Sequence, residues 1–463
     1  MGETERYGAV DTGWAQGELA KIDLGDARLE RRLRRVAEDL SQQPEYPINL
    51  ASEGAAATKA AYRLFDNEKC SPDKILSAHR NRTLSRMREV PLVLAIQDTS
   101  FFNFTSHKKT KGLGPIGDSS GTLQGLLLHS TFAVTPYGLP LGVLSHRCWA
   151  RQGFCQSDTS YKERPFVDKE SFKWVEALRD VTALPTSSTT TVVHVADREC
   201  DIYEFLREAQ GLGARYLIRA CHDRAIESDE FGNINEQLDV LSPHALVSLD
   251  VPTQKRKADL ELRFTQIILR APSRIAKAER LPLSCWVVHV VEPRPPSGYE
   301  PLSWTLLTNI EVSSVDEAIE KISWYRRRWS IEEFHKVLKS GCAVEDCRLQ
   351  TAERLSRYLA LFCVIAWRIF WMVHVSRTDP HAPAEVALTT SEIAALCSLE
   401  RFNAKTFTPV SLTVRQAVSA IAALGGHLAR KNDPPPGTLA IWRGWQRLAS
   451  MTELYDSMVK RCG

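Results

Sequence analysis

The sequence predicts a mixed α/β core that carries an all-β insertion and lies between two helical modules. Short apolar, β-branched segments alternate with helical patterns from about residue 71 to about residue 212. Strand-like segments separated by turn residues then follow, up to about residue 312. Helical periodicity dominates before residue 70 and after residue 312. These three observations together give the predicted order of the elements.

Composition limits the class of protein. The chain has 463 residues and a formal net charge of +3, so there is material for several domains and no overall charge that indicates a polyanionic partner. Eleven cysteines are spread singly, without the spacing of a zinc site or a disulfide framework, which is typical of reduced thiols in a cytosolic protein. The start, MGETERYGAV, lacks the basic and apolar regions of a secretory signal.

One apolar segment, Leu359–Val375, is nearly long enough to cross a membrane. Arg368 lies near its centre and His374 near its end, and a charged side chain is costly to bury in hydrocarbon. We therefore expect a helix in the core of a soluble protein and no membrane partner.

Residues 1–70 are predicted to form a small helical module. The segment LGDARLERRLRRVAEDLSQQ carries five arginines within eight residues, and an alanine-rich helix ends in a Tyr-Arg pair that includes Arg63. We expect exposed arginines on this module, Arg28, Arg32 and Arg63 among them. The alternative is a solvated helix face on which the arginines pair with neighbouring acids.

Two predicted strands run directly into an aspartate. VPLVLAIQDTS reaches Asp98, and TTTVVHVADRECD reaches Asp197. Between them, LLLHSTFAV and LPLGVLSHR flank the turn TPYG as a hairpin, and SFKWVEALRDVTAL has helical periodicity. Active sites of α/β sheets collect at strand ends, so both aspartates are candidate site residues.

The segment YRRRWSIEEFHKVLK, Tyr325–Lys339, is predicted to be one helix. At about 100° per residue its polar and aromatic side chains form one stripe, and its apolar side chains, Ile331 and Phe334 among them, lie on the other side. Glu333 lies at the edge of this stripe and His335 lies outside it. We therefore expect Glu332 to be the functional carboxylate and His335 to pack in the core. The predicted stripe comprises Tyr325, Arg328, Trp329, Glu332, Lys336 and Lys339.

Charge on this segment is unbalanced. Between residues 321 and 339 there are six Lys or Arg side chains and two Glu side chains. The alternative interpretation is that these charges form ion pairs for stability, but the two glutamates cannot neutralise six cations. A phosphate-bearing partner accounts for both signs, because cations such as Arg328 and Lys336 bind the nucleic-acid backbone while a carboxylate holds a divalent metal.

These residues resemble the signature Y-x2-R-x3-E-x6-K of the insertion-sequence-four family, bacterial cut-and-paste DDE transposases typified by the transposase of transposon five. Tyr325, Arg328, Glu332 and Lys339 fit every interval, and the segment 197–201, DRECD, is similar to a second motif of the family. The resemblance extends to the N-terminal and C-terminal helical segments.

The resemblance implies three domains: a transposon-end DNA-binding domain at 1–70, an RNase H-like catalytic domain at 71–372 with the β insertion at about 212–312, and a dimerisation domain at 373–463. It implies that Asp98, Asp197 and Glu332 hold two Mg²⁺ ions, with Mn²⁺ able to substitute. Further implied roles are phosphate contacts of Tyr325, Arg328 and Lys339, and stacking of Trp304 on a flipped base. The residues alone favour a different interpretation of Trp304, a core aromatic on a strand.

The implied activity is metal-dependent phosphoryl transfer on DNA. Hydrolysis frees a 3′-hydroxyl, which forms a hairpin that is opened and joined to target DNA. The implied partners are the terminal inverted repeats, target DNA and a second copy of the chain in the synaptic complex, in the bacterial cytoplasm and nucleoid. The alternatives are a catalytically silent DNA-binding regulator and a nuclease that cuts without joining. Asp201 is expected to cap the helix that follows it.

Overall fold

The computed structural model describes residues 14–52, 54–117, 121–152, 164–251, 254–277, 280–399, 412–430, 433 and 435–462. The N-terminal segment judged above for a secretory signal lies outside these residues. The chain divides into two compact units. Unit 1 comprises Met1–Pro91, Thr99–Ser157 and Glu332–Gly463, and unit 2 comprises Leu92–Asp98 and Asp158–Ile331.

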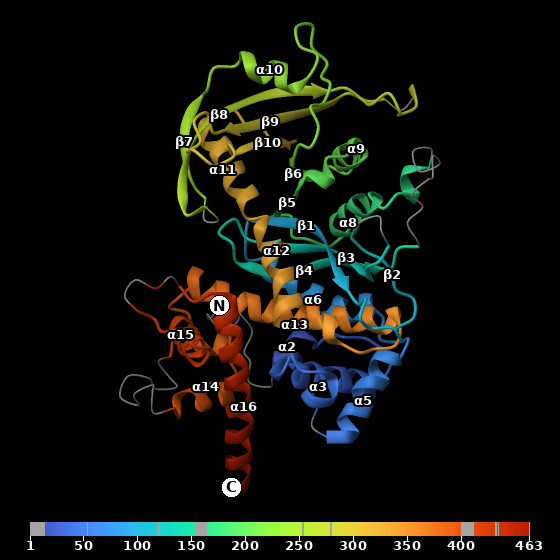
Figure 1. Cartoon of the computed structure of the whole chain (residues 1–463), viewed down its shortest axis with the longest axis vertical. Helices are drawn as coiled ribbons and strands as arrows, with labels where there is room; N and C mark the ends of the chain where they lie inside the picture. Colours follow the sequence, from blue (N-terminus) through green and yellow to red (C-terminus); the bar gives the residue numbers. More distant parts are fainter. Residues whose placement is uncertain are drawn as a thin grey trace. The chain divides into compact units, whose positions relative to one another are not determined.

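Unit 2 is built on a mixed sheet (Figure 1). Its first three strands are parallel, and the others are antiparallel to their neighbours. In spatial order they are β1 (Leu92–Asn103, of which Leu92–Asp98 belong to this unit), β5 (Thr191–Ala196), β6 (Arg215–Arg219), β10 (Ser303–Thr308), β9 (Leu283–Val291), β8 (Arg256–Leu269) and β7 (Ala245–Val251). The segment 212–312 is therefore mainly β, and one short helix, α10 (Ile234–Val240), lies within it.

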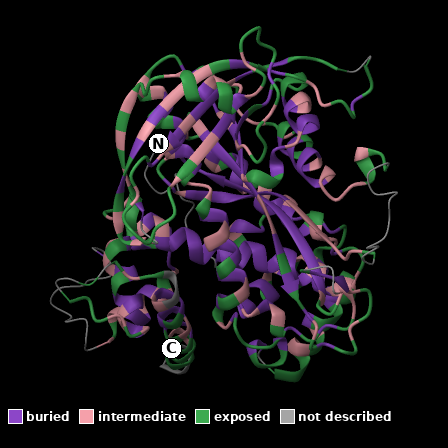
Figure 2. Ribbon diagram, turned by 45° about the horizontal axis from the view of Figure 1, so that its top comes forward, coloured by how far each residue is buried: buried purple, intermediate pink, exposed green. Residues whose placement is uncertain are grey.

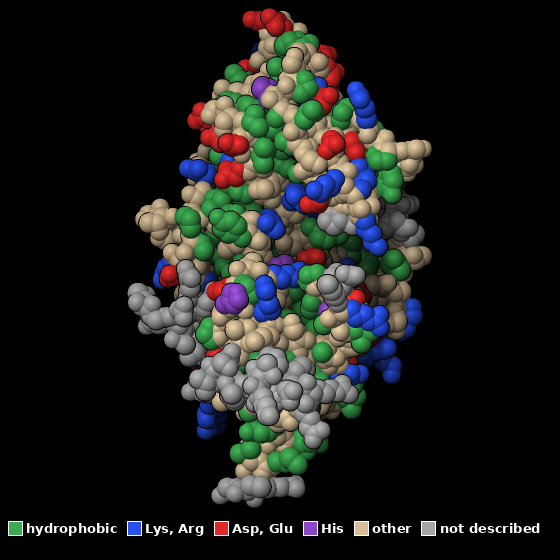
Figure 3. Space-filling view, turned by 90° about the vertical axis from the view of Figure 1, so that its left-hand side faces the viewer, with side chains coloured by type: hydrophobic (Ala, Val, Ile, Leu, Met, Phe, Trp, Pro, Cys, Tyr) green, Lys and Arg blue, Asp and Glu red, His purple; other side chains and the backbone are tan. Residues whose placement is uncertain are grey.

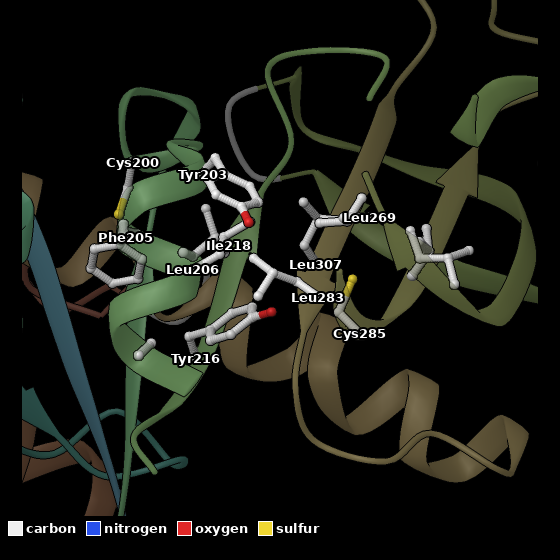
Figure 4. Close-up of a cluster of buried hydrophobic side chains, with 14 of the residues drawn as sticks. Cys200, Tyr203, Phe205, Leu206, Tyr216, Ile218, Leu269, Leu283, Cys285 and Leu307 are labelled. Carbon is white, nitrogen blue, oxygen red and sulfur yellow. The ribbon is translucent and has the colours of Figure 1, made fainter. Parts of the chain in front are cut away.

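Helices pack against this sheet. α9 (Tyr203–Gly211) contacts β6 and β9, and α11 (Val315–Arg326) contacts β5, β6 and β9. Apolar side chains of α8 (Phe172–Thr182) and α9 join those of the strands in one buried cluster, part of which Figure 4 shows. In that view Tyr203 and Leu206 of α9 lie opposite Tyr216 and Cys285 of the strands. Because β5 is almost continuously apolar, it is buried along most of its length, as expected for a strand covered on both faces.

Unit 1 contains the predicted hairpin. β3 (Gln124–Val134) and β4 (Pro140–Trp149) are antiparallel, and Val134 pairs with Pro140 across the TPYG turn. The short β2 (Gly114–Pro115) pairs with β3, and Thr99–Asn103 of β1 also belong to this unit. A Cβ at Gly125 of β3 would lie 1.9 Å from the Phe102 carbonyl oxygen of β1, so only glycine permits this approach. Figure 2 shows the central strands coloured mainly as buried.

The other main elements described in unit 1 are helices, which confirms the predicted helices near both ends of the chain. α6 was not predicted, although Ser71 caps its first turn and Pro72 occupies its first position. The helices of this unit are α2 (Trp14–Glu18), α3 (Ala27–Gln42), α4 (Ile48–Ala51), α5 (Gly54–Asp66), α6 (Pro72–Met87), α13 (Ala352–Thr378), α14 (Thr390–Cys397), α15 (Val414–Leu424) and α16 (Thr438–Cys462).

The apolar segment that could have been a membrane span is the core helix α13. It is long and apolar enough to cross a membrane, yet 89% of its most apolar window is buried inside the protein. The Arg368 guanidinium lies 5.2 Å from the ring centre of Trp14 and 4.7 Å from that of Trp445, and one of its nitrogens is 3.4 Å from a Glu392 oxygen. The charge in the middle of the helix is thus stabilised by aromatic rings and a carboxylate.

Candidate active site

The two predicted aspartates lie on neighbouring parallel strands. β5 ends at Ala196 and Asp197 follows it, as predicted. The prediction that a strand also ends at Asp98 is wrong, because β1 continues to Asn103. Its pairing with β5, however, stops at Ile96 opposite Val195. The apolar, β-forming residues after Asp98 extend the strand beyond its partner, and continuing the register by two residues places Asp98 beside Asp197.

Burial, hydrogen bonding and nearby charges affect the pKa of Asp197. Its Oδ1 accepts a hydrogen bond from the Glu199 backbone N–H at 2.9 Å. Burial raises the pKa of Asp197, the negative charge of Asp98 raises it further, and the charge of Arg328 opposes both. Arg198 also lowers it, so two carboxylates and two guanidinium groups interact in this region of unit 2.

The signature segment is not the single helix that periodicity predicted. α11 ends at Arg326, Arg327 and Arg328 form a turn, and α12 (Trp329–Lys336) begins after it. The backbone N–H groups of Arg327 and Arg328 donate to the carbonyls of Trp324 and Tyr325, each at 3.0 Å, which tightens the chain into a 3₁₀-type turn. No proline or glycine marks this break in the sequence.

Tyr325 is buried, with 5% of its surface exposed, so it does not lie on an outward-facing stripe. Its ring packs edge-on against that of Trp304, with 5.4 Å between ring centres, and the Arg328 guanidinium lies 6.0 Å from its ring centre. Burial raises the pKa of Tyr325, the cations Arg328 and Arg219 lower it, and Asp197 raises it. Trp304 is half-buried on β10, so it is not a fully enclosed core residue.

Arg219, the last residue of β6, was missed by sequence reasoning. β5 and β6 pair up to Ala196 opposite Ile218, so the next residues along, Asp197 and Arg219, are neighbours. The Arg219 side chain is hydrogen-bonded to Tyr325, and its Nη2 donates to the Ser303 carbonyl at 2.9 Å. The sequence did contain a signal for this residue, because Arg219 is an arginine at the end of the next predicted strand after Asp197.

The later signature residues belong to unit 1. Glu332 lies in the first turn of α12 and is half-buried, while Ile331, Phe334, Val337 and Leu338 are buried, as predicted for the apolar side. Glu333 lies 3.8 Å from Nε2 of His374, and burial raises its pKa. His335 is buried, with Nε2 3.5 Å from the Ser130 hydroxyl, which confirms a packing role.

Lys336 ends α12 and is exposed, whereas Lys339 lies in a π-helical turn, Val337–Gly341. The Cys342 N–H donates to the Val337 carbonyl at 2.8 Å, which is the wide i to i+5 bond of that turn. The Lys339 ammonium lies 5.4 Å from the ring centre of Phe102. Lys339 therefore does not follow the α-helical stripe on which it was placed.

Three family models match the chain. The model "Transposase DNA-binding" matches residues 11–70, "Transposase DDE domain" matches residues 173–367, and "Transposase Tn5 dimerisation domain" matches residues 364–458. The chain belongs to the insertion-sequence-four family of DDE transposases, the family of the transposon-five transposase. Its mixed α/β fold is that of an RNase H-like transposase. The catalytically silent regulator is not favoured.

Members of DDE transposase families depend on divalent metal ions, and the aspartate pair of this transposase fits such an ion. Carboxylate oxygens are the ligands that hard cations prefer, and a cation would relieve the repulsion that raises the pKa of Asp197. Among the described residues, no three His, Cys, Asp or Glu side chains are grouped as a metal site. Two of the three predicted carboxylates lie together in unit 2, and Glu332 belongs to unit 1.

The DNA-binding module of the transposase exposes its candidate arginines. Arg28 and Arg32 on α3 and Arg63 on α5 are exposed, while Leu29 and Leu33 on the other side of α3 are buried. Some arginines of α3 do pair locally, as in the 3.6 Å contact of Arg35 with Asp39. Figure 3 shows Lys and Arg side chains interspersed with Asp and Glu on the face that it presents.

An open groove of about 660 Å³ lies along α5. Small side chains, basic groups and one tyrosine are among its lining residues. It is lined by Asn49, Gly54, Ala55, Thr58, Lys59, Tyr62, Arg63, Asp66 and Arg354. Small side chains permit close approach of a DNA backbone, and basic side chains attract its phosphates.

Proposed function

We propose that this transposase cuts and joins DNA at the ends of a mobile element, with Asp98, Asp197 and Glu332 as metal ligands. The observation that carries the proposal is the side-by-side placement of Asp98 and Asp197 on β1 and β5, with Arg328, Tyr325 and Arg219 around them. Mg²⁺ is the proposed ion, two per site, with Mn²⁺ able to substitute. When bound, such ions stabilise negative charge on the attacking and leaving oxygens of a phosphodiester.

The residues of the chain bind and orient the DNA. Arg328 and Arg219 supply charge-assisted hydrogen bonds to phosphate oxygens, and Tyr325 holds Arg219 through its hydroxyl. Lys336 and Lys339 extend this positive charge along the segment that follows Glu332. Binding the strand in this way orients its scissile bond for in-line attack by water, and then for attack by the freed 3′-hydroxyl.

The order of steps that we propose is cut-and-paste. Water cleaves one strand, the freed 3′-hydroxyl attacks the opposite strand to form a hairpin, and the hairpin is opened and joined to target DNA. A hairpin bends a strand sharply, and stacking a displaced base on Trp304 offsets roughly 1–3 kcal/mol of that cost. The half-buried ring, fixed edge-on by Tyr325, supports this role.

We further propose that residues 1–70 bind the terminal inverted repeats through Arg28, Arg32 and Arg63, and that residues 71–372 and 373–463 form the catalytic and dimerisation domains. The N-terminal family match and the exposed arginines support the first assignment. A DNA-binding transposase is expected in the cytoplasm, and we place this one in bacteria and on the nucleoid.

For the homodimer we propose an interface on the last turns of α16. Ile441, Trp442 and Trp445 in its first half are buried, but Leu454 and Met458, one turn apart, are each 59% exposed. Figure 1 shows these turns extending beyond α14 and α15, and Figure 3 shows hydrophobic side chains on this end. The family match for dimerisation ends at residue 458 and makes a second copy of the chain the expected occupant.

The dimer proposal is tested by substituting both apolar residues, Leu454→Glu and Met458→Glu. We expect the variant to bind end DNA as one copy per duplex in analytical ultracentrifugation, whereas wild type assembles two copies with two ends. Glu453→Lys, on another side of the helix, is the control and is expected to assemble normally. Normal assembly of the double variant would contradict the interface.

The cleavage proposal is tested with purified protein, Mg²⁺ or Mn²⁺, and a duplex that carries the sequence flanking the gene. Asp98→Ala, Asp197→Ala and Glu332→Ala are each expected to abolish nicking and to retain end binding in gel-shift assays. Glu333→Ala is the matched control and is expected to cut. Normal cutting by Glu332→Ala, or equal loss in Glu333→Ala, would remove Glu332 from the site.

A further inference from the structure

Asp201 is a buried carboxylate close to the candidate site. It lies four residues beyond Asp197, and its side chain is 0% exposed. The predicted helix-capping role is wrong, because Ile202 is the N-cap of α9 and no side chain caps that helix. A buried carboxylate is costly unless donors satisfy it, so its partners indicate what it does.

The side-chain hydrogen-bond partners of Asp201 come from the segment after β6. Its Oδ2 accepts from the backbone N–H groups of Cys221 and His222 at 2.7 and 3.1 Å. Its Oδ1 accepts from Nε of Arg224 at 2.6 Å, and Nη2 of Arg224 donates to the Asp201 carbonyl at 2.5 Å. One residue thus joins the turn that follows β5 to the chain that follows β6.

This connection lies just beyond the point where the pairing of β5 with β6 ends, at Ala196 opposite Ile218. Asp197 and Arg219 are the next residues on the two strands, so Asp201 and its partners flank both of them. Cys200 and Tyr203, on either side of Asp201, lie in the buried cluster with Ile218 (Figure 4). The turn is therefore anchored to the core by apolar packing and to the neighbouring strand by the carboxylate.

We propose that Asp201 is a positioning residue, which sets the spacing between Asp197 and Arg219 by bonding the backbone beyond both strand ends. This inference rests on the proposed function, in which Arg219 binds the phosphate that reacts at the aspartates. Groups in such a site must be held to within about 0.5 Å, and a carboxylate that accepts two backbone N–H bonds and an arginine bond restricts the backbone at this point.

The chain contains a matched control. Glu204, also buried and on α9, accepts from Nη2 of Arg274 at 2.9 Å and from its Nη1. It is a carboxylate paired with an arginine in the same part of unit 2. Its arginine partner lies in the segment between β8 and β9, so the pair does not join β5 to β6.

The experiment compares full-length Asp201→Asn and Glu204→Gln in single-turnover nicking of the flanking-sequence duplex with Mg²⁺. We expect Asp201→Asn to cut about 10- to 100-fold more slowly at saturating DNA, with unchanged DNA affinity, because misplacing reacting groups by about 1 Å has an effect of that size. Glu204→Gln is expected to cut at nearly the wild-type rate. Each variant is assayed at the same interval below its own Tm, so that lost stability alone does not separate them.

Arg224→Lys keeps the positive charge but not the bond to the Asp201 carbonyl. This variant replaces Asp201→Asn in the experiment if Asp201→Asn does not fold. We expect it to slow cutting by less than Asp201→Asn does and to leave DNA affinity unchanged. Cutting by Asp201→Asn and Arg224→Lys at the rate of Glu204→Gln would overturn the inference. Failure of wild type to cut would instead overturn the proposed function, so the two failures are distinguishable.

Discussion

Two acidic residues, Glu18 in unit 1 and Asp197 in unit 2, are placed in opposite electrostatic surroundings. Burial of Glu18 raises its pKa, but the charge of Arg86 and a 2.5 Å hydrogen bond with His79 lower it to about 2. Burial and the Asp98 carboxylate instead raise the pKa of Asp197. The charges next to Glu18 favour its ionised form, whereas the Asp98 carboxylate disfavours ionised Asp197, and a raised carboxyl pKa of this kind is typical of a functional group.

The largest expected effect separates these two residues. Asp197→Asn removes one of two like charges, so we expect cleavage to fall below detection while Tm stays the same or rises. Calorimetry and nicking assays on one preparation measure both. A fall in Tm with retained cleavage would reverse the contrast between the two acids.

Glu18→Gln is expected to do the opposite. It leaves Arg86, whose side chain is 13% exposed, beside a neutral group, and removing one partner of a buried pair costs up to about 3–5 kcal/mol. The folded pKa of about 2 lies below the ordinary value of 4.5, so the contribution of Glu18 is present above pH 4.5 and is lost as pH falls toward 2. Denaturant unfolding at pH 7 should show the loss, and nicking at low temperature should be retained.

Glu38 has a smaller effect on the free energy of unfolding, and its pH dependence is opposite to that of Glu18. Burial raises its pKa from 4.5 to about 7, against the opposing charge of Arg368. The folded state therefore binds this proton more tightly, and stability falls as pH rises from about 4.5 through 7. We expect Glu38→Gln to stabilise the protein at pH 8 by on the order of 1–3 kcal/mol and to have little effect at pH 4. Equal effects at both pH values would contradict this.

The smallest effect tests the aromatic side of the site. Trp304→Ala is expected to slow hairpin formation by roughly tenfold and to leave first-strand nicking nearly unchanged, because base stacking is realised only when the strand bends. Separate quantification of nicked and hairpin products gives both rates. Trp304→Phe, which keeps an aromatic face, is the control, and equal slowing of both steps would leave Trp304 as a packing residue.

Local pattern predicted much of this fold. The hairpin around TPYG, the helix that includes Trp174, and the strand that ends before Asp197 each follow from periodicity and turn residues over a few positions. The spacing from Tyr325 to Lys339 also pointed to the family that the domain matches show.

Other features depend on contacts between distant segments. The continuation of β1 past Asp98 and the neighbours of Arg219 come from strand register, which no local pattern contains. The turn at Arg327 and Arg328 breaks a sequence of good helix formers, and Tyr325, just before it, is buried. The local sequence predicted a helix-capping role for Asp201, because its actual side-chain partners lie about twenty residues further along the chain.

The wide turn at Val337–Gly341 changes how the interval between Glu332 and Lys339 is wound. A π turn accommodates one residue more than an α-helical turn does, so these seven steps are not two regular helical turns. Deleting a single residue there would let the backbone relax to ordinary α-helical winding, which would change the direction of Lys339 relative to Glu332. Homologues that lack this extra residue would need a different lysine position to make the same contact.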